Sequence, residues 1–523
     1  WGGTAHFVDD GNALVFGSGT AEQMVTFEND IDLNGAERTI RVNTNPDTDS
    51  DWAVLSGTLS NGALRKTGEG TLELAPADGD NTYTGTTTVA DGALRAEDGI
   101  ALPADSDLVL DGGVFESSGS FDRTLEGGAV PNAVAWGGSG GFAAHGGALE
   151  VALTGMHNQV FQLGTHLPDN ESLMFGSATA DDTVQFANPV QMNERILTVD
   201  VADNGSTDQD VAVITGRLNG FTGSDEKTKC GLVKTGEGTL HVYASSELND
   251  IYGSNANRNY YEGDTEIRAG ALRATSAPMT PHGIPWESNL RLNGGVFESS
   301  GVYNRDLGDG RGNVQWLGSG GFAAYGGVFS VDLSTTPLAW DTAYAPGDGD
   351  KMMLSSKTAD NVVDMQDDVD LAAGARAVYV EDNAHRGGDY ARLSGNVTNG
   401  ELVKEGPGTL ELTGAANVFD CVHVDGGALR ADDGSALPAV AGIDLDGGVL
   451  ESHGTFTRDL GTGAGELNWS GDGGFSADDQ PLDVNLAGGG TLTWAADDGF
   501  VADNCALVFG LSTAQNTLDF QND

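Results

Sequence analysis

Short runs of alternating apolar and polar residues fill the whole chain. Segments such as TLEL, GALRA and GALEVAL place an apolar side chain at every second position, and Gly, Asn-Gly or Asp-Gly ends each run. No stretch keeps a helical spacing of apolar residues over three turns, because Gly interrupts each candidate. The pattern therefore predicts an all-β chain.

The same order of short motifs passes along the chain three times. Residues 1–30 align without gaps with residues 494–523, and fourteen of these thirty positions are identical. Further copies begin near Phe161 and at Trp340. Because the last copy stops in mid-pattern, we interpret the sequence as an excerpt of a longer chain. The predicted boundaries are 1–160 for the first repeat, 161–339 for the second, 340–493 for the third and 494–523 for the start of a fourth.

The spacing of the strands narrows the architecture to two alternatives. Strands recur every 8–12 residues with no helical crossover, which fits a parallel β-helix of tandem repeats or a string of β-sandwich domains. A string of sandwiches requires linkers, and no Pro/Ser-rich or charged linker separates the copies. We therefore predict a parallel β-helix (β-solenoid) with one coil per about 20–25 residues, which would stack into a rod on the order of 100 Å long.

One motif in each repeat resembles a known family. Residues 62–96 run from GALRKTGEGTLEL through NTYTGTTTV to GALRA, and residues 231–274 and 400–431 follow a similar course. This course is similar to the autotransporter-associated β-strand repeat. The second copy carries an insertion at 245–262, and the third departs from the pattern at its centre, where it has ANVFDCVHVDGG. The resemblance implies a secreted β-helical passenger or giant surface protein of bacteria, located outside the cell or on its surface.

The charge of the chain excludes some partners. Seventy-eight acidic residues against 25 basic ones give a net charge of −53, which repels nucleic-acid phosphates and anionic membrane surfaces. No apolar run is long enough to insert into a membrane. The acidic surface would keep neighbouring rods soluble, or it would suit a medium rich in salt or divalent cations that screen the repulsion.

Almost half of the basic residues recur in register. A repeated position favours a repeated structural role, such as a guanidinium that pairs with a carboxylate on the next strand. Binding of an anionic glycan is the functional alternative. Recurring glutamates, which are Glu116, Glu298 and Glu451, supply candidate partners. The four basic columns are Arg38/Arg195/Arg376, Lys66/Lys234/Lys404, Arg95/Arg273/Arg430 and Arg123/Arg305/Arg458.

Calcium is the only cofactor that the sequence suggests. One acid, Asp51, Asp210 or Asp389, recurs where each repeat enters a strand. These residues are candidate calcium ligands, or they start turns by bonding their own backbone. The nine histidines neither recur in register nor form an H-E-x-x-H or H-x-H pair, so no structural zinc site is expected. The three cysteines form no disulfide framework.

Two groups of aromatic residues are candidates for ligand binding. Trp136, Trp316 and Trp469 precede glycine-rich tracts, where they would either stack on sugars or pack into corners of the coil. The insertion in the second repeat presents Tyr252, Tyr260 and Tyr261 among Asn, Ser and Gly. That composition is typical of a binding loop, although a solvated insertion would look the same.

The sequence thus predicts a non-enzymatic structural rod, stalk or filament of an extracellular bacterial surface protein. Its first partners are neighbouring repeats of the same chain; like fibres, glycans and cell-surface proteins are the further partners considered. Two alternatives remain open. One is an adhesin that binds glycan or protein through loops on the rod, and the other is a carbohydrate-active β-helix enzyme, for which clustered carboxylates would be required.

Overall fold

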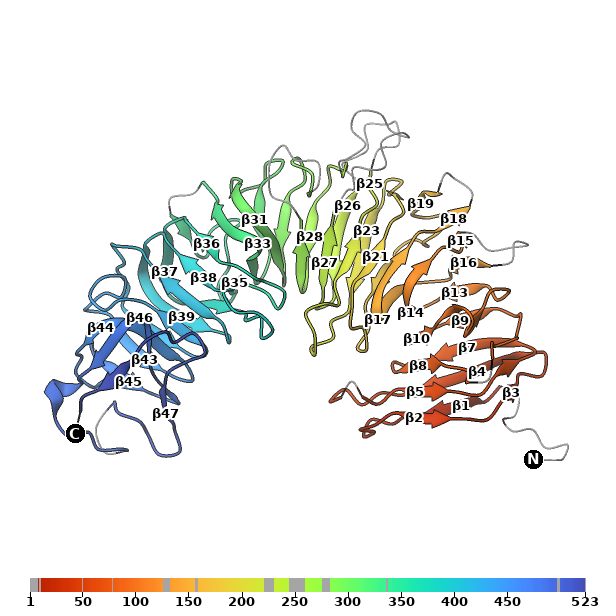
Figure 1. Ribbon diagram of the computed structural model, residues 1–523. Helices are drawn as coiled ribbons and strands as arrows, with labels where there is room; N and C mark the ends of the chain where they lie inside the picture. Colours follow the sequence, from red (N-terminus) through yellow and green to blue (C-terminus); the bar gives the residue numbers. More distant parts are fainter. Residues whose placement is uncertain are drawn as a thin grey trace. The chain divides into compact units, whose positions relative to one another are not determined.

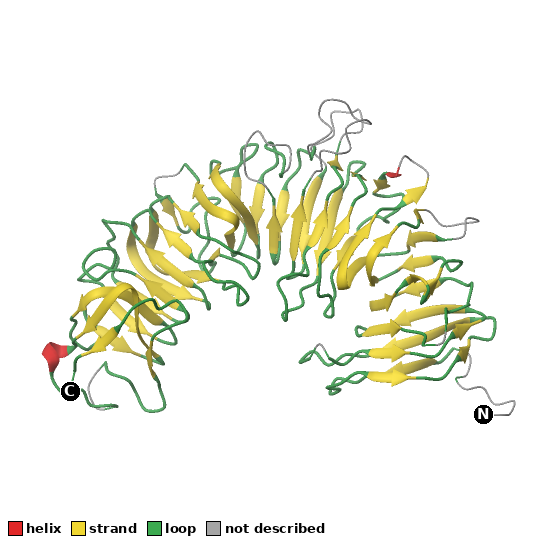
Figure 2. Cartoon of the chain, viewed as in Figure 1, coloured by secondary structure: helices red, strands yellow, loops and turns green. Residues whose placement is uncertain are grey.

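The computed structural model of the chain is built from short β-strands joined by turns and loops (Figure 2). It describes residues 8, 11–48, 50–77, 79–125, 132–155, 159–220, 230–243, 259–274, 283–334, 337–495 and 499–522. A single turn of 3-10 helix spans Ala487–Gly489. Among the described residues, no helix has the length and apolar character needed to cross a membrane. The all-β prediction is therefore confirmed.

The chain divides into two compact units. The first holds residues 1–265 and 281–285, and the second holds residues 266–280 and 286–523. Within each unit, successive coils lie on top of one another as parallel strands (Figure 1). This stacking is that of a parallel β-helix, as the sequence predicts.

Two long stacks of strands run through the first unit, and the short strands β19 (Phe161–Gln162), β22 (Val190–Gln191) and β25 (Leu218–Asn219) form a further stack. In one stack, Thr39 pairs with Ala13 on one side and with Arg65 on the other, and Arg65 pairs with Thr88. These partners are 26, 26 and 23 positions apart, and Leu72 and Leu94 of the other stack are 22 apart, so these coils lie in or close to the predicted range of 20–25 residues. The first stack contains β1 (Ala13–Phe16), β4 (Glu37–Val42), β7 (Ala63–Thr67), β9 (Thr87–Val89), β13 (Leu108–Leu110) and β16 (Ala133–Trp136). The second contains β2 (Val25–Phe27), β5 (Ala53–Leu55), β8 (Thr71–Leu74), β10 (Gly92–Ala96), β14 (Gly113–Phe121) and β17 (Gly140–Val151).

The second unit repeats the arrangement. Long coils occur in both units: Phe322 pairs with Leu354 and Phe475 with Phe509 in the second unit, as Phe142 pairs with Phe175 in the first. One stack contains β35 (Met352–Leu354), β37 (Val369–Val380), β39 (Val397–Glu405), β41 (Cys421–Val424), β43 (Gly442–Leu445) and β45 (Leu467–Trp469). The other contains β36 (Val363–Met365), β38 (Ala391–Leu393), β40 (Thr409–Leu412), β42 (Ala428–Arg430), β44 (Val449–Phe456) and β46 (Gly473–Val484).

Alternation along the strands separates the core from the outer face. Leu72, Leu94, Phe115 and Phe142 occupy one register position on successive strands and are buried inside the coils. Successive residues of a strand point to opposite faces. The residue after each of these, such as Arg95 after Leu94, therefore lies on the outer face of the stack, and that face carries the Arg95 and Glu116 columns.

The recurring tryptophans pack into corners of the coil. Trp136, Trp316 and Trp469 are buried, and the indole Nε1 of Trp136 and of Trp316 donates a 2.8 Å hydrogen bond to a glycine carbonyl four residues on. This burial favours the corner role over stacking on sugars. In the glycine tract that follows, a Cβ on Gly141 would lie 1.8 Å from the carbonyl oxygen of Met174. Only glycine allows the strands to approach so closely.

The two matching end segments form matching strands. Residues 1–30 contribute β1 and β2, and residues 494–523 contribute β47 (Leu507–Phe509) and β48 (Leu518–Phe520) at the corresponding sequence positions. In both pairs a phenylalanine of one strand contacts a phenylalanine of the next, with ring centroids 6.1 Å apart for Phe16 and Phe27 and 5.4 Å apart for Phe509 and Phe520. The sequence repeat is thus also a structural repeat at these two places.

Candidate functional site: a charged ladder and its neighbouring grooves

A ladder of alternating charges follows the outer face of the first unit. Glu73, Arg95 and Glu116 occupy the same register position on β8, β10 and β14. Arg95 Nε donates to Glu116 Oε1 at 2.5 Å, and Arg95 Nη1 lies 3.4 Å from Glu73 Oε2. Adjacent strands are about 4.8 Å apart. The ladder therefore brings opposite charges into contact between coils, where like charges would repel each other.

Glu116 is the centre of this ladder. Its side chain is 0% exposed, and Ser177 Oγ and Thr179 Oγ1 donate hydrogen bonds to its Oε2 at 2.5 and 2.9 Å. The carboxylate thus accepts bonds from a guanidinium and from two hydroxyls. A buried charge with this many partners is costly to disturb, because removing any partner leaves charge uncompensated in the interior.

The same contact recurs in the second unit. Arg273 Nε donates to Glu298 Oε2 at 2.6 Å, and Arg430 Nε donates to Glu451 Oε2 at 2.9 Å. The hydroxyls recur as well: Ser356 Oγ bonds Glu298 Oε1 at 2.9 Å, and Thr513 Oγ1 bonds Glu451 Oε1 at 3.0 Å. The prediction that the arginine and glutamate columns pair between coils is confirmed for these six residues.

In the third repeat the ladder is longer. Asp364 on β36 and Arg392 on β38 continue it in register from Glu411, Arg430 and Glu451. Arg392 Nε donates to Glu411 Oε2 at 2.5 Å. Five consecutive strands therefore carry charges of alternating sign, in a chain whose overall charge is strongly negative.

The arginines that follow each ladder tie loops to the coils. Arg123 pairs with Asp98 and donates to the carbonyl oxygens of Ser106 and Pro103. Arg458 makes the corresponding contacts to Asp433, Ala441 and Pro438. Arg305 donates to the carbonyl oxygen of Ser288 at 2.8 Å, and its guanidinium lies over the ring of Trp286.

The recurring lysines are buried and bind backbone carbonyls. Lys66 Nζ donates to the carbonyl oxygens of Gly68, Gly70 and Asp91. Lys404 Nζ donates to those of Glu405, Gly406 and Gly426, each at 2.9 Å. Burial lowers the pKa of Lys66, Lys234 and Lys404 to about 7. These ammonium groups close the Lys-x-Gly-x-Gly turn, and the described contacts give them no role toward a ligand.

The remaining basic column also makes internal contacts. Arg38 Nε donates to the carbonyl oxygen of Leu33 at 3.0 Å, and Arg376 Nε donates to that of Leu371 at 3.1 Å. Arg195 Nε instead pairs with Asp169 Oδ1 at 2.5 Å, and this contact raises the pKa of Arg195 and lowers that of Asp169. Each of these arginines thus holds a turn of its own coil or a loop of a neighbouring one.

The predicted calcium ligands hold turns. Asp51, Asp210 and Asp389 each accept a hydrogen bond at Oδ2 from the backbone N–H of an asparagine six residues earlier, at 2.6, 2.7 and 2.8 Å. That asparagine in turn donates to a carbonyl on the preceding coil, as Asn383 does to Ala359. Burial raises the pKa of Asp389 to about 6. The turn interpretation accounts for these contacts, and the calcium role stays a prediction.

The predicted tyrosine loop is only partly described. Tyr252 and most of the insertion lie outside the described residues. Tyr260 is half-buried, and its backbone bridges to Asn219. Tyr261 is 1% exposed, and its hydroxyl lies 2.8 Å from Thr265 Oγ1. Tyr261 therefore belongs to the core and not to an exposed loop, because its ring fills the interior of the coil.

The first repeat contains a buried hydroxyl network that the sequence-based predictions above do not include. The Tyr83 hydroxyl lies 2.8 Å from Thr87 Oγ1, which lies 2.9 Å from Ser106 Oγ, and all three residues are buried. Tyr261 and Thr265 repeat the first of these contacts. The shared Asn-x-Tyr-x-Gly-x-Thr spacing indicates this tyrosine–threonine contact, since Tyr83 and Tyr261 occupy the same place in it.

Two grooves lie beside the ladders at matching positions. The groove of the first unit is lined by Asp51, Trp52, Thr71 and Thr179 among others. The groove of the second unit has Asp389, Tyr390, Thr409 and Thr513 at the corresponding places. Each groove thus combines an aromatic ring, hydroxyls and a carboxylate. These groups can bind a polar ligand, but several bond each other, as Thr71 Oγ1 and Thr179 Oγ1 do at 2.9 Å.

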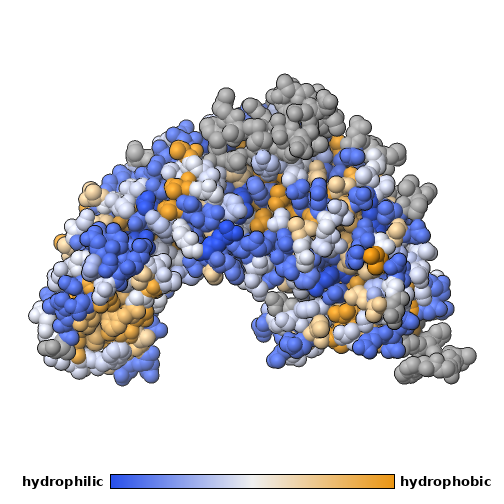
Figure 3. All heavy atoms as spheres, viewed as in Figure 1, coloured by the Kyte–Doolittle hydropathy of each residue, from blue (hydrophilic) through white to orange (hydrophobic). Residues whose placement is uncertain are grey.

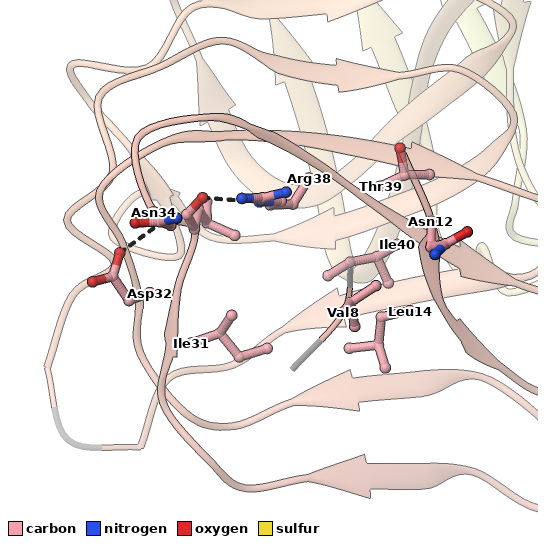
Figure 4. Close-up of a pocket in the computed structure, with 10 residues that line it drawn as sticks. Val8, Asn12, Leu14, Ile31, Asp32, Asn34, Arg38, Thr39 and Ile40 are labelled. Carbon is pink, nitrogen blue, oxygen red and sulfur yellow. Dashed lines mark hydrogen bonds between the residues drawn. The ribbon is translucent and has the colours of Figure 1, made fainter. Parts of the chain in front are cut away.

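A third pocket lies at the first coil (Figure 4). Leu14, Ile31 and Ile40 supply an apolar lining, and Arg38 and Asp32 lie at its side, where both are engaged in turn hydrogen bonds. The described residues of this pocket thus offer mainly hydrophobic surface. Polar side chains otherwise dominate the face of the molecule shown in Figure 3, with apolar residues scattered among them.

Comparison with known proteins gives a family for the repeated motif. The chain matches no curated protein and no solved structure. Three segments, residues 64–96, 232–274 and 402–430, match the passenger-associated-transport-repeat family. They contain the buried lysines Lys66, Lys234 and Lys404 and the recurring arginines Arg95, Arg273 and Arg430. These three segments are therefore similar to the passenger-associated-transport repeat, which is consistent with a repeat protein of the autotransporter passenger type.

Proposed function

We propose that this chain is a structural rod or stalk segment of an extracellular bacterial surface protein and that it has no catalytic function. One observation carries the proposal: the glutamates that recur in every repeat each pair with an arginine on a neighbouring coil of the same chain. Glu116, Glu298 and Glu451 are each 0% exposed and each accept an arginine from the preceding coil. Because these arginine–glutamate pairs join neighbouring coils, they support a mechanical role for the chain.

Mechanical unfolding tests this proposal directly. The parent chain is pulled in a single-molecule force experiment beside the triple variant Glu116→Ala/Glu298→Ala/Glu451→Ala. A rod whose coils are joined by these contacts is expected to unfold at clearly lower force in the triple variant. The variant Glu69→Ala/Glu237→Ala, which removes exposed acids of the Lys-x-Gly-x-Gly turns, is the control and should behave as the parent. Equal unfolding forces for parent and triple variant, or turnover of an acidic polysaccharide by the parent, would contradict the proposal.

A second candidate function is adhesion to a glycan through the grooves. The observation in its favour is that an aromatic side chain lines both grooves at the same position, Trp52 in one and Tyr390 in the other, and aromatic faces with nearby polar groups are suited to polar ligands. A glycan array probed with the parent and with Tyr390→Ala tests it. Binding that Tyr390→Ala abolishes would support adhesion, and an array with no signal would leave the rod function alone.

A further inference from the structure

A set of metal-ligating side chains lies at the end of the ladder in the third repeat. His453 comes from β44, and Asp478 and Asp479 come from the neighbouring strand β46. One donor atom from each of the three lies within 4.8 Å of the others. The pairing of the two strands changes register between Ser452 and Gly454, and such bulges redirect side chains. The bulge is what brings the two aspartates opposite the histidine.

The other repeats have the bulge but not the donors. Ser118 and Ser300 stand where His453 does, and a glycine, Gly146 or Gly326, stands where Asp479 does. His145 and Tyr325 replace Asp478. The fold therefore forms without these three donors, so their presence together in one copy is not a requirement of the coil.

The donors carry more negative charge than their neighbours balance. Asp432 Oδ1 lies 3.0 Å from His453 Nδ1, and Asp479 Oδ1 lies 3.7 Å from the same atom. Arg430 is 3.5 Å from Asp478, but its guanidinium is already bonded to Glu451 at 2.9 Å. Three carboxylates thus surround one imidazole, with a single shared arginine beside them.

We propose that His453, Asp478 and Asp479 bind one divalent metal ion of the zinc class. Imidazole nitrogen with carboxylate oxygen suits Zn²⁺, whereas Ca²⁺ and Mg²⁺ prefer oxygen ligands alone. Bonds of about 2.0–2.2 Å require the donors to lie closer together than they do here. Asp479 is 63% exposed, so rotation of its side chain can close the site. The sequence did not suggest zinc, because the donors lie on different coils and form no local motif.

The site would join two adjacent coils. A ligand that binds only the folded state stabilises it in proportion to its concentration above the dissociation constant. Bound metal would therefore protect β44 and β46 against local opening. This inference does not depend on the rod function, because a metal site can serve a rod or an adhesin equally.

Titration of the whole chain with Zn²⁺ tests the proposal. Calorimetry should show one equivalent of tight sites in the parent, and either His453→Ala or Asp479→Asn should weaken that binding about tenfold or more. His145→Ala is the matched control: His145 is 34% exposed against 33% for His453, and it faces a single exposed carboxylate, Asp181, at 3.1 Å. His145 also lies 4.0 Å from Glu116, but that carboxylate is buried and bonded to Arg95, so zinc binding of His145→Ala should equal that of the parent. Ca²⁺ and Mg²⁺ should not compete for the tight site at matched ionic strength.

Equal zinc affinity in the parent, His453→Ala and Asp479→Asn would overturn the proposal, as would an equal loss in His145→Ala. Circular dichroism melts in the presence of chelator establish that the variants fold like the parent. If His453→Ala did not fold, Asp479→Asn would decide the question, since its exposed side chain can be changed without disturbing the core.

Discussion

The first and third repeats share a strand register but stabilise it in different ways. In the first, Tyr83, Thr87 and Ser106 form a buried chain of hydroxyls. In the third, the strand partners and loop contacts place Phe419, Val422 and Ala441 at these positions, and all three are apolar. All three hydroxyl groups of the network are thus replaced together in the third repeat. A half-satisfied buried network is worse than an apolar core, so the three positions can change only together.

On the outer surface, the third repeat is the one with more polar and charged side chains. The third repeat places Arg392 where the first has Val54, and it adds His423 and Asp444 where the first has Thr88 and Val109. His423 Nδ1 lies 3.3 Å from Asp444 Oδ2. The first repeat therefore relies more on buried hydroxyls and the third more on ionic contacts at the surface. The third should accordingly respond more strongly to salt and pH.

The largest expected effect is the loss of the central glutamate. Glu116→Ala leaves Arg95 without its closest partner and two hydroxyls without an acceptor, so it should cost about 3–5 kcal/mol of local stability. Glu451→Ala should cost less, because Arg430 keeps Asp478 in addition to Glu411, whereas Arg95 keeps Glu73. Native-state hydrogen exchange of the adjacent strands measures both. Equal losses of stability in Glu116→Ala and Glu451→Ala would contradict the proposed difference between the first and third repeats.

The hydroxyl network should be strongly non-additive. Tyr83→Phe alone leaves Thr87 and Ser106 incompletely bonded in the core and should cost about 1–3 kcal/mol. The triple variant Tyr83→Phe/Thr87→Val/Ser106→Ala reproduces the side chains of the third repeat and should be nearly as stable as the parent. Hydrogen exchange in β9 and β13 provides the measurement. If the triple variant lost as much stability as the three single variants added together, the hydroxyl residues of the first repeat and the apolar residues of the third would not be interchangeable.

The pH dependence should differ between the repeats at His423. The bond to Asp444, together with that to Cys421, raises the pKa of His423 to about 10 from the ordinary 6.5. The folded state holds this proton more tightly than the unfolded state. The stabilisation is therefore complete below about pH 6.5 and is lost as the pH rises through 10. Melting curves should show this loss in the parent and not in His423→Gln. A parallel decline in both would rule out His423 as its source.

The smallest expected effect concerns the outer rung of the ladder. Arg392→Val introduces the residue of the first two repeats, Val54 and Val213. It should cost about 1 kcal/mol or less at low salt and still less in 1 M NaCl, because the Arg392–Glu411 pair is partly exposed and screened. Denaturant titrations at two salt concentrations give the difference. A loss that does not depend on salt would indicate that Arg392 acts through packing.

Recurrence in the sequence predicted much of this structure. The β-helix and the pairing of arginine with glutamate followed from positions such as Arg95 and Glu116, which return in each copy. Recurrence does not tell whether a side chain faces inward or outward in an irregular segment. The insertion therefore suggests a loop position for Tyr261, although its spacing from Thr265 matches that of the buried Tyr83 from Thr87.

Features present in one copy were beyond prediction. His453 and Asp479 approach each other only because neighbouring coils stack with a particular bulge, and the sequence does not give that register. The apolar residues of the third repeat could not be predicted either. The segment from Asn417 to Val424 is one residue shorter than the corresponding segment from Asn81 to Val89. A gapless alignment of the motif therefore misplaces Val422.

A double-mutant cycle on Arg95 and Glu116 tests the central claim most directly, namely that the recurring charges bind coil to coil. Arg95→Leu, Glu116→Leu and the double variant are compared with the parent by hydrogen exchange in β10 and β14. The account predicts that the double variant loses clearly less stability than the two single variants together, because each single change leaves the other charge buried alone. Additive losses would contradict it, since they would show that the two residues contribute independently.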